Sequence, residues 1–325
     1  MKNSALIVSF SFEQVPKAFS TLTDAGITPV VWEHDPKAQL AAEELIAFWS
    51  TLAPKPRAIV MGADVEITEP FLRQAPELKS ISLNCAGYDH VDLDACARHG
   101  VTVCNVPRRN FDAVADFAWG EILCLMRNIY KADACIRAGK WCEGVERSAA
   151  VSRKTIGIVG MGAIGQAVAR RAKGFDMNIV ALSTSKKPAL AETFGLAFLD
   201  GEDFFRAADI VVLCCPHNES THHLINAQSL AWMKPEAFLV NPSRGGIVDT
   251  QALKAALEQG SIAGAALDVF EEEPLFESDL FRLSNVLLTP HIGGLADREI
   301  DEVAILSAEH CVATLEGKTP DSKLV

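Results

Sequence analysis

The chain has 325 residues, enough for two domains of roughly 100 to 200 residues each. Hydrophobic residues make up 49% of it and charged residues 22%, which is typical of a folded globular protein and excludes a disordered or fibrous one. The formal net charge of -12 has the wrong sign for a surface that neutralises polyanions, so nucleic acids and anionic membranes are disfavoured as partners. A single basic cleft for a small anion is compatible with this balance.

The cysteine pattern and the hydropathy of the chain indicate its compartment. Nine cysteines are present, an odd number, and no Cys-x-x-Cys pair occurs, which argues against both a disulfide framework and a zinc site. The apolar run at residues 5–10 is too short for a signal peptide. No apolar stretch reaches about 18 uncharged residues, since Glu121 interrupts the best candidate, at residues 117–126. We expect a cytoplasmic protein with no membrane span and no bound metal.

The first third of the chain alternates short apolar runs with segments of helical length. Runs of this kind predict buried strands, here at residues 5–10, 28–33, 57–62, 81–85 and 101–105. Strands that alternate with helices predict βαβ units and a parallel sheet.

From Asp112 the apolar spacing becomes helical, and we predict one long helix, capped by Asp112, that runs to about Arg137 and bridges two halves of the chain. A second strand series follows at residues 155–160, 178–183, 210–215, 237–241, 265–270 and 286–289. It predicts a second, larger α/β domain. A terminal helix over residues 298–316 is too little for a domain of its own, so we expect it to pack on an earlier part of the chain.

A glycine-rich segment follows the first strand of the second series. Residues 155–159 lead directly into Gly160-x-Gly162-x-x-Gly165, after which the composition is helical. In a dinucleotide site Gly160 would allow the tight turn, Gly162 would let the backbone approach a pyrophosphate, and Gly165 would allow close helix packing. The alternative is a plain glycine turn without a ligand.

The end of the next strand lacks the acid that would accept a hydrogen bond from the 2′-hydroxyl of NAD. The strand at residues 178–182 is followed instead by Ser183, Thr184, Ser185, Lys186 and Lys187. Hydroxyls and two cations suit a 2′-phosphate, so we predict a preference for NADP. The alternative is that the lysines belong to a solvated turn and that the protein accepts both cofactors.

Three further segments, residues 241–249, 267–275 and 288–294, place polar residues at strand ends, where open α/β sheets bind ligands. They contribute Arg244, a group of acids and His291. Hydride reduction of a 2-oxo acid needs a cation on the carboxylate, a proton donor at the carbonyl oxygen and a group that keeps this donor protonated. Arg, His and an acid are suited to these three tasks.

Taken together, these motifs resemble those of the D-isomer-specific 2-hydroxyacid dehydrogenases. The resemblance also covers residues 84–92, Asn105-Val106-Pro107 and the Thr-Pro-His-Ile-Gly motif at residues 289–293. It implies an α/β protein with two doubly wound parallel-sheet domains. We expect a flavodoxin-like substrate domain at residues 1–104 plus 296–325 and a Rossmann NAD(P)-binding domain at residues 105–295.

The resemblance also assigns roles to single residues. It implies that Arg244 binds the substrate carboxylate and that His291 is the general acid and base. Glu273 would pair with His291 and hold its proton, while Asp268 would face the nicotinamide carboxamide. Glu271 and Glu272 are then solvated neighbours, so the choice of Glu273 rests on the motif. His217 is a weaker candidate for cofactor contact.

Backbone N–H groups at Ala86 and Gly87 resemble the family's second carboxylate clamp, which hinge closure would bring towards Arg244. The cofactor is expected to contact residues of the glycine turn and of the strand ends that follow it. These are Gly160, Gly162, Ala163, Ile164, Gly165, Ser183, Thr184, Ser185, Lys186, Cys215, Pro216, Ser243, Asp268, His291 and Gly293.

Two positions depart from the pattern. Asp116 stands where relatives commonly carry Glu, which keeps the charge and changes the reach, and Cys85 stands where relatives often carry glycine. Neither change touches the hydride chemistry.

The activity expected is NADPH-dependent reduction of a small 2-oxo acid, glyoxylate or hydroxypyruvate, to its D-2-hydroxy acid. An NAD-dependent D-3-phosphoglycerate or other D-2-hydroxyacid dehydrogenase is the first alternative, and it is less favoured because no further C-terminal domain follows in this sequence. Glu273 counts against a formate dehydrogenase, whose relatives carry an amide there. A non-enzymatic NAD(P)-sensing protein of the corepressor type is a third class. We expect a homodimer, because the apolar helix from Asp112 resembles the family's dimerising element.

Overall fold

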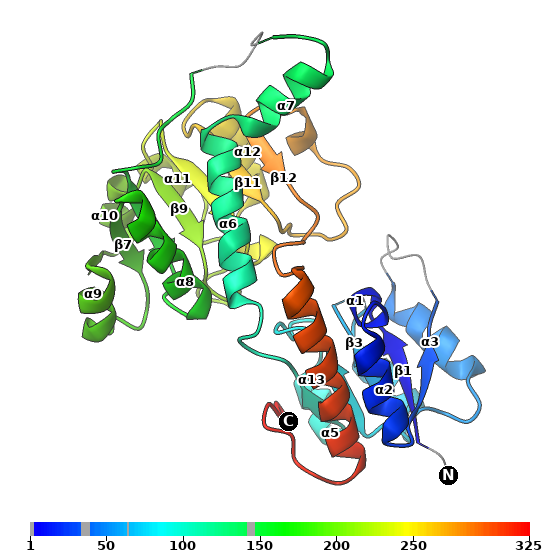
Figure 1. Cartoon of the computed structure of the whole chain (residues 1–325). Helices are drawn as coiled ribbons and strands as arrows, with labels where there is room; N and C mark the ends of the chain where they lie inside the picture. Colours follow the sequence, from blue (N-terminus) through cyan, green and yellow to red (C-terminus); the bar gives the residue numbers. More distant parts are fainter. Residues whose placement is uncertain (1–2, 34–39, 64, 142–146) are drawn as a thin grey trace. The chain divides into compact units, whose positions relative to one another are not determined.

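The computed structural model describes residues 3–33, 40–63, 65–141 and 147–325. The chain divides into two compact units (Figure 1). The first comprises Met1–Asn110 and Leu295–Val325, and the second comprises Phe111–Gly294. The chain therefore leaves the first unit once and returns to it for its last helix.

The first unit is built on a five-stranded parallel sheet in the order β2-β1-β3-β4-β5. This order is that of the flavodoxin-like doubly wound fold. Its strands are β1 (Ser4–Val8), β2 (Thr28–Val31), β3 (Ala58–Met61), β4 (Ser80–Leu83) and β5 (Thr102–Cys104). Every residue of β1, β3 and β4 is buried, as expected for parallel strands covered on both faces.

The helices of the first unit are α1 (Phe10–Glu13), α2 (Pro16–Asp24), α3 (Ala42–Thr51), α4 (Glu69–Gln74), α5 (Leu93–Arg98) and α13 (Asp297–Leu315). The terminal helix α13 lies along α2 (Figure 1). Its buried Ala304, Ala308 and Cys311 share a core with Ile7 and Leu22. The terminal helix thus packs on an earlier part of the chain, as predicted.

The second unit has a seven-stranded parallel sheet in the order β12-β11-β10-β9-β6-β7-β8. Its strands are β6 (Thr155–Val159), β7 (Asn178–Leu182), β8 (Leu196–Phe198), β9 (Ile210–Leu213), β10 (Phe238–Asn241), β11 (Gly264–Leu267) and β12 (Val286–Leu288). The order in which strands are added reverses at β6, which pairs in parallel with both β7 and β9. This is the switch point at which doubly wound sheets of the Rossmann type bind ligands. The predicted fold class is confirmed.

The helices of the second unit are α6 (Phe111–Met126), α7 (Ile129–Arg137), α8 (Ala163–Ala172), α9 (Pro188–Phe194), α10 (Gly201–Ala207), α11 (Ala227–Trp232) and α12 (Thr250–Glu258). One core cluster joins buried residues of α6 and α8 to the strands beneath them, for example Ile122, Val168 and Ile158. The longest of these helices, α6, therefore packs against both the sheet and the helix that follows the glycine turn.

The predicted long helix from Asp112 to Arg137 is wrong in one respect, because it is broken into α6 and α7. Asn128 lies between them with φ of 54°, a left-handed conformation that asparagine adopts more readily than most residues. Asp112 is also not the cap, since α6 already begins at Phe111.

Other predicted boundaries shift for local reasons. The first strand ends at Val8, because Ser9 caps α1 by accepting a hydrogen bond from the Phe12 N–H. The strand predicted at residues 265–270 ends at Leu267. The short edge strand β8, only three residues long, was not predicted.

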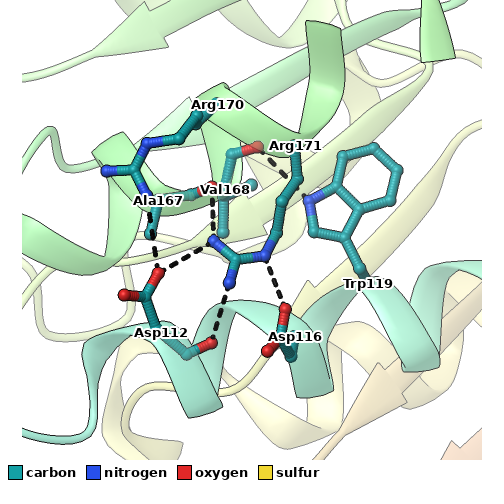
Figure 2. Close-up of polar contacts among 7 residues, drawn as sticks. All are labelled: Asp112, Asp116, Trp119, Ala167, Val168, Arg170 and Arg171. Carbon is teal, nitrogen blue, oxygen red and sulfur yellow. Dashed lines mark hydrogen bonds and ion pairs between the residues drawn. The ribbon is translucent and has the colours of Figure 1, made fainter. Parts of the chain in front are cut away.

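A polar cluster ties the start of α6 to α8 (Figure 2). The Arg171 guanidinium donates through Nε to Asp116 Oδ1 at 2.6 Å and through Nη1 to Asp112 Oδ1 at 3.1 Å. Nη2 donates to the backbone oxygen of Asp112, and the Trp119 indole donates to the Val168 carbonyl. Asp116, one of the two departures noted in the sequence, thus holds the helix of the glycine turn.

Candidate active site

The predicted site residues of the second unit follow six strands of one parallel sheet. The glycine turn follows β6, residues 183–187 follow β7, and Cys215 follows β9. Arg244, Asp268 and His291 follow β10, β11 and β12. Parallel strands end at the same edge of a sheet, so the fold gathers these segments along one edge.

The glycine turn has the geometry that a dinucleotide requires. Gly160 has φ of +93°, and a Cβ atom there would lie 2.8 Å from the Cys214 carbonyl oxygen. A Cβ on Gly165 would lie 2.0 Å from the Gly160 oxygen, so no larger residue fits the helix against the turn. Gly162, by contrast, is exposed, caps α8 and has open space where its Cβ would be. The N-terminus of α8 is therefore accessible to a phosphate group, and the residues present fit the cofactor.

The loop after β7 is exposed and folds on itself. The Ser185 N–H donates to Ser183 Oγ at 3.3 Å, while Thr184 is exposed. Lys186 forms an ion pair with Asp200, which follows β8. Both partners of this pair are exposed. The structure therefore brings to this loop an acid that the sequence pattern did not reveal, and part of the Lys186 charge is already paired.

Arg244 stands on a loop that neighbouring strands fix. Ser243 Oγ donates to the Cys215 carbonyl oxygen at 2.5 Å, and Asn241 donates through Nδ2 to the Arg244 carbonyl oxygen at 2.9 Å. A Cβ on Gly245 would overlap the Phe270 backbone, so this loop lies directly against the segment that carries the predicted acid. The Arg244 guanidinium donates to the Ser243 carbonyl oxygen and is near enough to Glu273 to act on its charge.

His291 and Glu273 form the predicted pair. His291 Nδ1 and Glu273 Oε2 are 2.6 Å apart, and Glu273 Oε1 accepts a hydrogen bond from the Phe270 N–H at 2.8 Å. Burial alone would raise the pKa of Glu273, but His291, the Phe270 N–H and Arg244 together lower it below its ordinary value. Glu273 is therefore held as a carboxylate that orients the imidazole through Nδ1, and Nε2 of His291 takes no part in this contact.

Asp268 holds the loop that carries His291. Its side chain is almost fully buried and accepts hydrogen bonds from Thr289 Oγ1 at 2.7 Å, the Ile292 N–H at 2.9 Å and the Gly293 N–H at 2.7 Å. Its own carbonyl oxygen accepts from the His291 N–H at 2.8 Å. His291 itself has φ of 52°, a left-handed conformation that these bonds keep in place. That Asp268 faces a carboxamide stays a prediction.

The predicted substrate residues of the first unit lie just after β4. Asn105 Nδ2 donates to the Ala86 carbonyl oxygen at 2.7 Å, and the Cys85 thiol donates to the Gly87 carbonyl oxygen at 3.2 Å. Cys85, the second departure noted in the sequence, therefore closes the loop on itself. The approach of Ala86 and Gly87 to Arg244 stays a prediction.

Three other histidines lie near this edge without a catalytic arrangement. His217 Nε2 lies 3.1 Å from His222 Nδ1, and His223 Nε2 lies 2.6 Å from Glu271 Oε1. Glu271, expected to be solvated, also accepts from the Thr250 N–H. Within the described residues no cluster of His, Cys, Asp and Glu could hold a metal ion. None of the described helices is long and apolar enough to span a membrane.

Sequence reasoning missed the group that stands behind Asp268. Glu121 on α6 is buried and has one oxygen 3.5 Å from Thr289 Oγ1. Its only signal in the sequence was a charge in the otherwise apolar stretch at residues 117–126.

A Rossmann-type sheet with this glycine turn, and with Arg, Glu and His at successive strand ends, defines a nucleotide-dependent dehydrogenase. Residues 119–293 match the family described as D-isomer specific 2-hydroxyacid dehydrogenase, NAD binding domain. The chain belongs to this family. It is an oxidoreductase that acts on CH–OH donors with a nicotinamide cofactor.

Individual relatives support the same assignment. The chain is 40% identical over 270 residues to a glyoxylate reductase of Thermococcus litoralis, with 81% of this chain and 82% of that protein covered. It is 36% identical over 316 residues to a D-3-phosphoglycerate dehydrogenase of Synechocystis, which covers 96% of this chain and 56% of that protein. The crystal structure of a glyoxylate reductase from Paecilomyes thermophila has a TM-score of 0.83 at 29% identity, with 99% of this chain and 98% of that chain covered.

Proposed function

We propose that the protein reduces glyoxylate or hydroxypyruvate to the corresponding 2-hydroxy acid, of D configuration where the product is chiral. The observation that carries this proposal is the 2.6 Å contact between His291 and Glu273 beside Arg244. A cation and an oriented proton donor at neighbouring strand ends are what reduction of a 2-oxo acid needs. The similarity to glyoxylate reductases favours glyoxylate, the smaller of the two substrates.

In the reaction, Arg244 binds the substrate carboxylate through two parallel hydrogen bonds, which fixes the carbonyl carbon in place. The nicotinamide, when bound, supplies the hydride that this carbon accepts. His291 donates its Nε2 proton to the carbonyl oxygen, which becomes the hydroxyl group of the product. Glu273 keeps the imidazole oriented and stabilises its positive charge before the transfer. The proton that His291 loses is then taken back from solvent.

The predicted cofactor contacts stay part of the proposal. Gly160, Gly162 and Gly165, with the N-terminus of α8, would hold the pyrophosphate. The remaining contacts are Ala163, Ile164, Ser183, Thr184, Ser185, Lys186, Cys215, Pro216, Ser243, Asp268, His291 and Gly293.

We infer that NADPH is preferred over NADH. The hydroxyls and the two lysines of residues 183–187 support a 2′-phosphate at the end of β7. Asp200 weakens phosphate binding in part, because its carboxylate pairs with Lys186 and would repel a phosphate. The preference is therefore expected to be moderate, with NADH still accepted.

The substrate clamp of the first unit is the remaining part of the site. We propose that backbone N–H groups at Ala86 and Gly87 bind the substrate carboxylate. The contacts of Asn105 and Cys85 with the carbonyl oxygens of this loop support the role, because they fix the loop's conformation before substrate arrives.

Assembly and location are inferred from surface and thiol chemistry. Helix α7 and the residues just after it expose Ile129, Ile136 and Trp141, a patch that supports a homodimer. Eight cysteines of the described residues are free thiols, which supports the reducing cytoplasm, while Cys142 lies outside those residues. Sedimentation of the wild type and of Ile136→Asp tests the dimer, since a charge in a buried interface would dissociate it.

A steady-state panel tests the activity. Glyoxylate, hydroxypyruvate, pyruvate, phenylpyruvate and 3-phosphohydroxypyruvate are each assayed with NADPH and NADH. We expect the highest kcat/KM with glyoxylate or hydroxypyruvate and NADPH. Highest kcat/KM with 3-phosphohydroxypyruvate and NADH would assign the protein instead to the activity of its Synechocystis relative. No turnover with any acid would favour a cofactor-sensing protein without catalysis.

A further inference from the structure

The proposed chemistry leaves one buried acid without a task. Glu121 is only 3% exposed and stands on α6 among the core residues Ala118, Ile122 and Leu125. Its Oε2 atom is buried and has no hydrogen-bond partner among the described residues. A carboxylate in such surroundings is costly, whereas a neutral carboxylic acid leaves only one carbonyl oxygen unsatisfied.

The other oxygen of Glu121 faces the loop that carries His291. Thr289 Oγ1 lies 3.5 Å from Glu121 Oε1 and 2.7 Å from Asp268 Oδ1. A hydroxyl group has one proton to donate, and the nearer acceptor is Asp268. The lone pairs of Thr289 Oγ1 are then available to Glu121, and a hydrogen bond forms between the two if Glu121 supplies the proton.

A second side chain of α6 contacts the same loop. A Cβ on Gly293 would lie 2.9 Å from Asp268 Oδ2 and 3.2 Å from Phe117 Cδ1, so Gly293 fits between these residues. Phe117 stands one helical turn before Glu121. One face of α6 therefore supports the loop at both ends, at Thr289 through a polar group and at Gly293 through a ring.

We propose that Glu121 is a positioning residue. As a neutral acid it donates a hydrogen bond to Thr289 Oγ1, and so fixes the hydrogen bond from Thr289 to Asp268 behind the loop of His291. Asp268 then carries the single negative charge of the buried pair and keeps its bonds to the Ile292 and Gly293 N–H groups. The inference rests on the proposed role of His291, which this loop presents to the substrate.

The electrostatics of the site agree with this arrangement. Burial, and after it the negative charge of Asp268, raise the pKa of Glu121 from 4.5 to about 8. The Thr289 hydroxyl acts in the opposite direction, because it can turn its proton towards Glu121 once that group ionises. Ionisation of Glu121 would thus draw Thr289 away from Asp268 and loosen the loop.

The sign of the pH effect on stability follows from the raised pKa. Below about pH 4.5 Glu121 is protonated in both the folded and the unfolded chain, and its contribution to the free energy of unfolding is fully present. As the pH rises from 4.5 to 8 the unfolded chain releases this proton and the folded protein retains it, so stability falls across this window.

The main test compares the wild type with Glu121→Gln, whose amide donates to Thr289 at every pH. Glu121→Leu serves as the control of similar size without a donor. The midpoint of thermal unfolding of the cofactor-free protein is measured between pH 6 and 9. We expect it to fall by roughly 5 °C more in the wild type than in Glu121→Gln. Equal pH slopes in the two proteins would overturn the proposal.

Turnover supplies the second readout. The ratio of the kcat values of Glu121→Gln and the wild type removes the pH dependence that the two proteins share. We expect a ratio near one at pH 6 that rises several-fold by pH 9, while Glu121→Leu loses about tenfold in kcat already at pH 6. A ratio that does not change with pH, or a fully active Glu121→Leu, would overturn the positioning role.

Thr289→Val tests the same link from the loop and applies even if the Glu121 variants fold poorly. It should lower kcat about tenfold at pH 6, and full activity would contradict the proposal. The unfolding measurements need neither substrate nor cofactor. If no 2-oxo acid is reduced but the pH slopes differ as expected, the proposed function fails and the buried link stands.

Discussion

Two loops at the same edge of the second unit are held in different ways. The loop of His291 is fixed by the buried Asp268, by backbone N–H donors and by Glu273. The loop after β7 is exposed, and Lys186 is paired there with an exposed acid. Buried charged hydrogen bonds hold a geometry firmly, whereas exposed ion pairs contribute little and are screened by salt. Under the proposed function, the reaction therefore depends on preorganised groups and the choice of cofactor on adjustable ones.

The largest effect is expected from the buried loop. His291→Ala should lower kcat about 10³-fold, because the substrate oxygen loses its proton donor. Binding of NADPH, followed by its fluorescence, should stay within a few-fold of the wild type. Retained turnover would remove His291 from its role, and a large loss of NADPH binding would show either that the substitution disturbs the fold or that the His291 contact contributes more to cofactor binding than proposed.

Glu273→Gln comes next. The amide keeps the size of the side chain but removes the charge that orients His291, so kcat should fall about 30-fold. Glu272→Gln, one position earlier, is the matched control and should be nearly silent. If the two variants had the same kcat, the 2.6 Å contact between Glu273 and His291 would not contribute to catalysis.

The polar cluster between α6 and α8 is intermediate in burial between these two loops. Arg171 is 22% exposed and its acidic partners are more exposed (Figure 2). Arg171→Gln should lower the free energy of unfolding by about 1 kcal/mol. Arg170→Gln is the control, because Arg170 is 59% exposed and makes one long contact, and it should change little. Denaturant unfolding of both variants measures the difference, and an equal loss would contradict the bridging role of Arg171.

The smallest effect is expected at the exposed loop. Lys186→Ala should raise KM for NADPH two- to fivefold, equivalent to about 0.5–1 kcal/mol, and leave KM for NADH unchanged. Asp200→Asn should act in the opposite direction, because it frees the Lys186 charge for a phosphate. Both effects should shrink at high salt. An equal change of KM for both cofactors would indicate that Lys186 does not contact the 2′-phosphate.

Much of the fold could be predicted because its signals are local. Apolar runs separated by helical segments predicted the parallel strands, and the glycine spacing predicted the turn between β6 and α8. The break at Asn128 and the strand end at Leu267 could not be predicted in this way. The apolar pattern continues past both points and so does not show where each element ends, and the left-handed backbone of Asn128 is visible only in the structure.

The residues of the site also divide into those that have a local sequence signal and those that do not. Arg244, Glu273 and His291 were predicted because each belongs to a distinctive motif at a strand end, and the structure brings Glu273 and His291 into contact. Asp200 and Glu121 belong to no such motif. Asp200 reaches Lys186 only because β8 lies beside β7, and Glu121 faces Thr289 only because α6 packs across the sheet.

The sequence by itself determined the class of the protein, since the order of strands and the residue types at their ends follow from short segments of chain. The tertiary structure decided the surroundings of these residues. Burial, hydrogen bonding and the sign of nearby charges depend on neighbours that are distant in the sequence, as Glu121 is from Thr289 and Asp112 from Arg171. The net charge of -12 likewise gave no indication of which acids are buried, paired or neutral, because only packing sets the environment of each one.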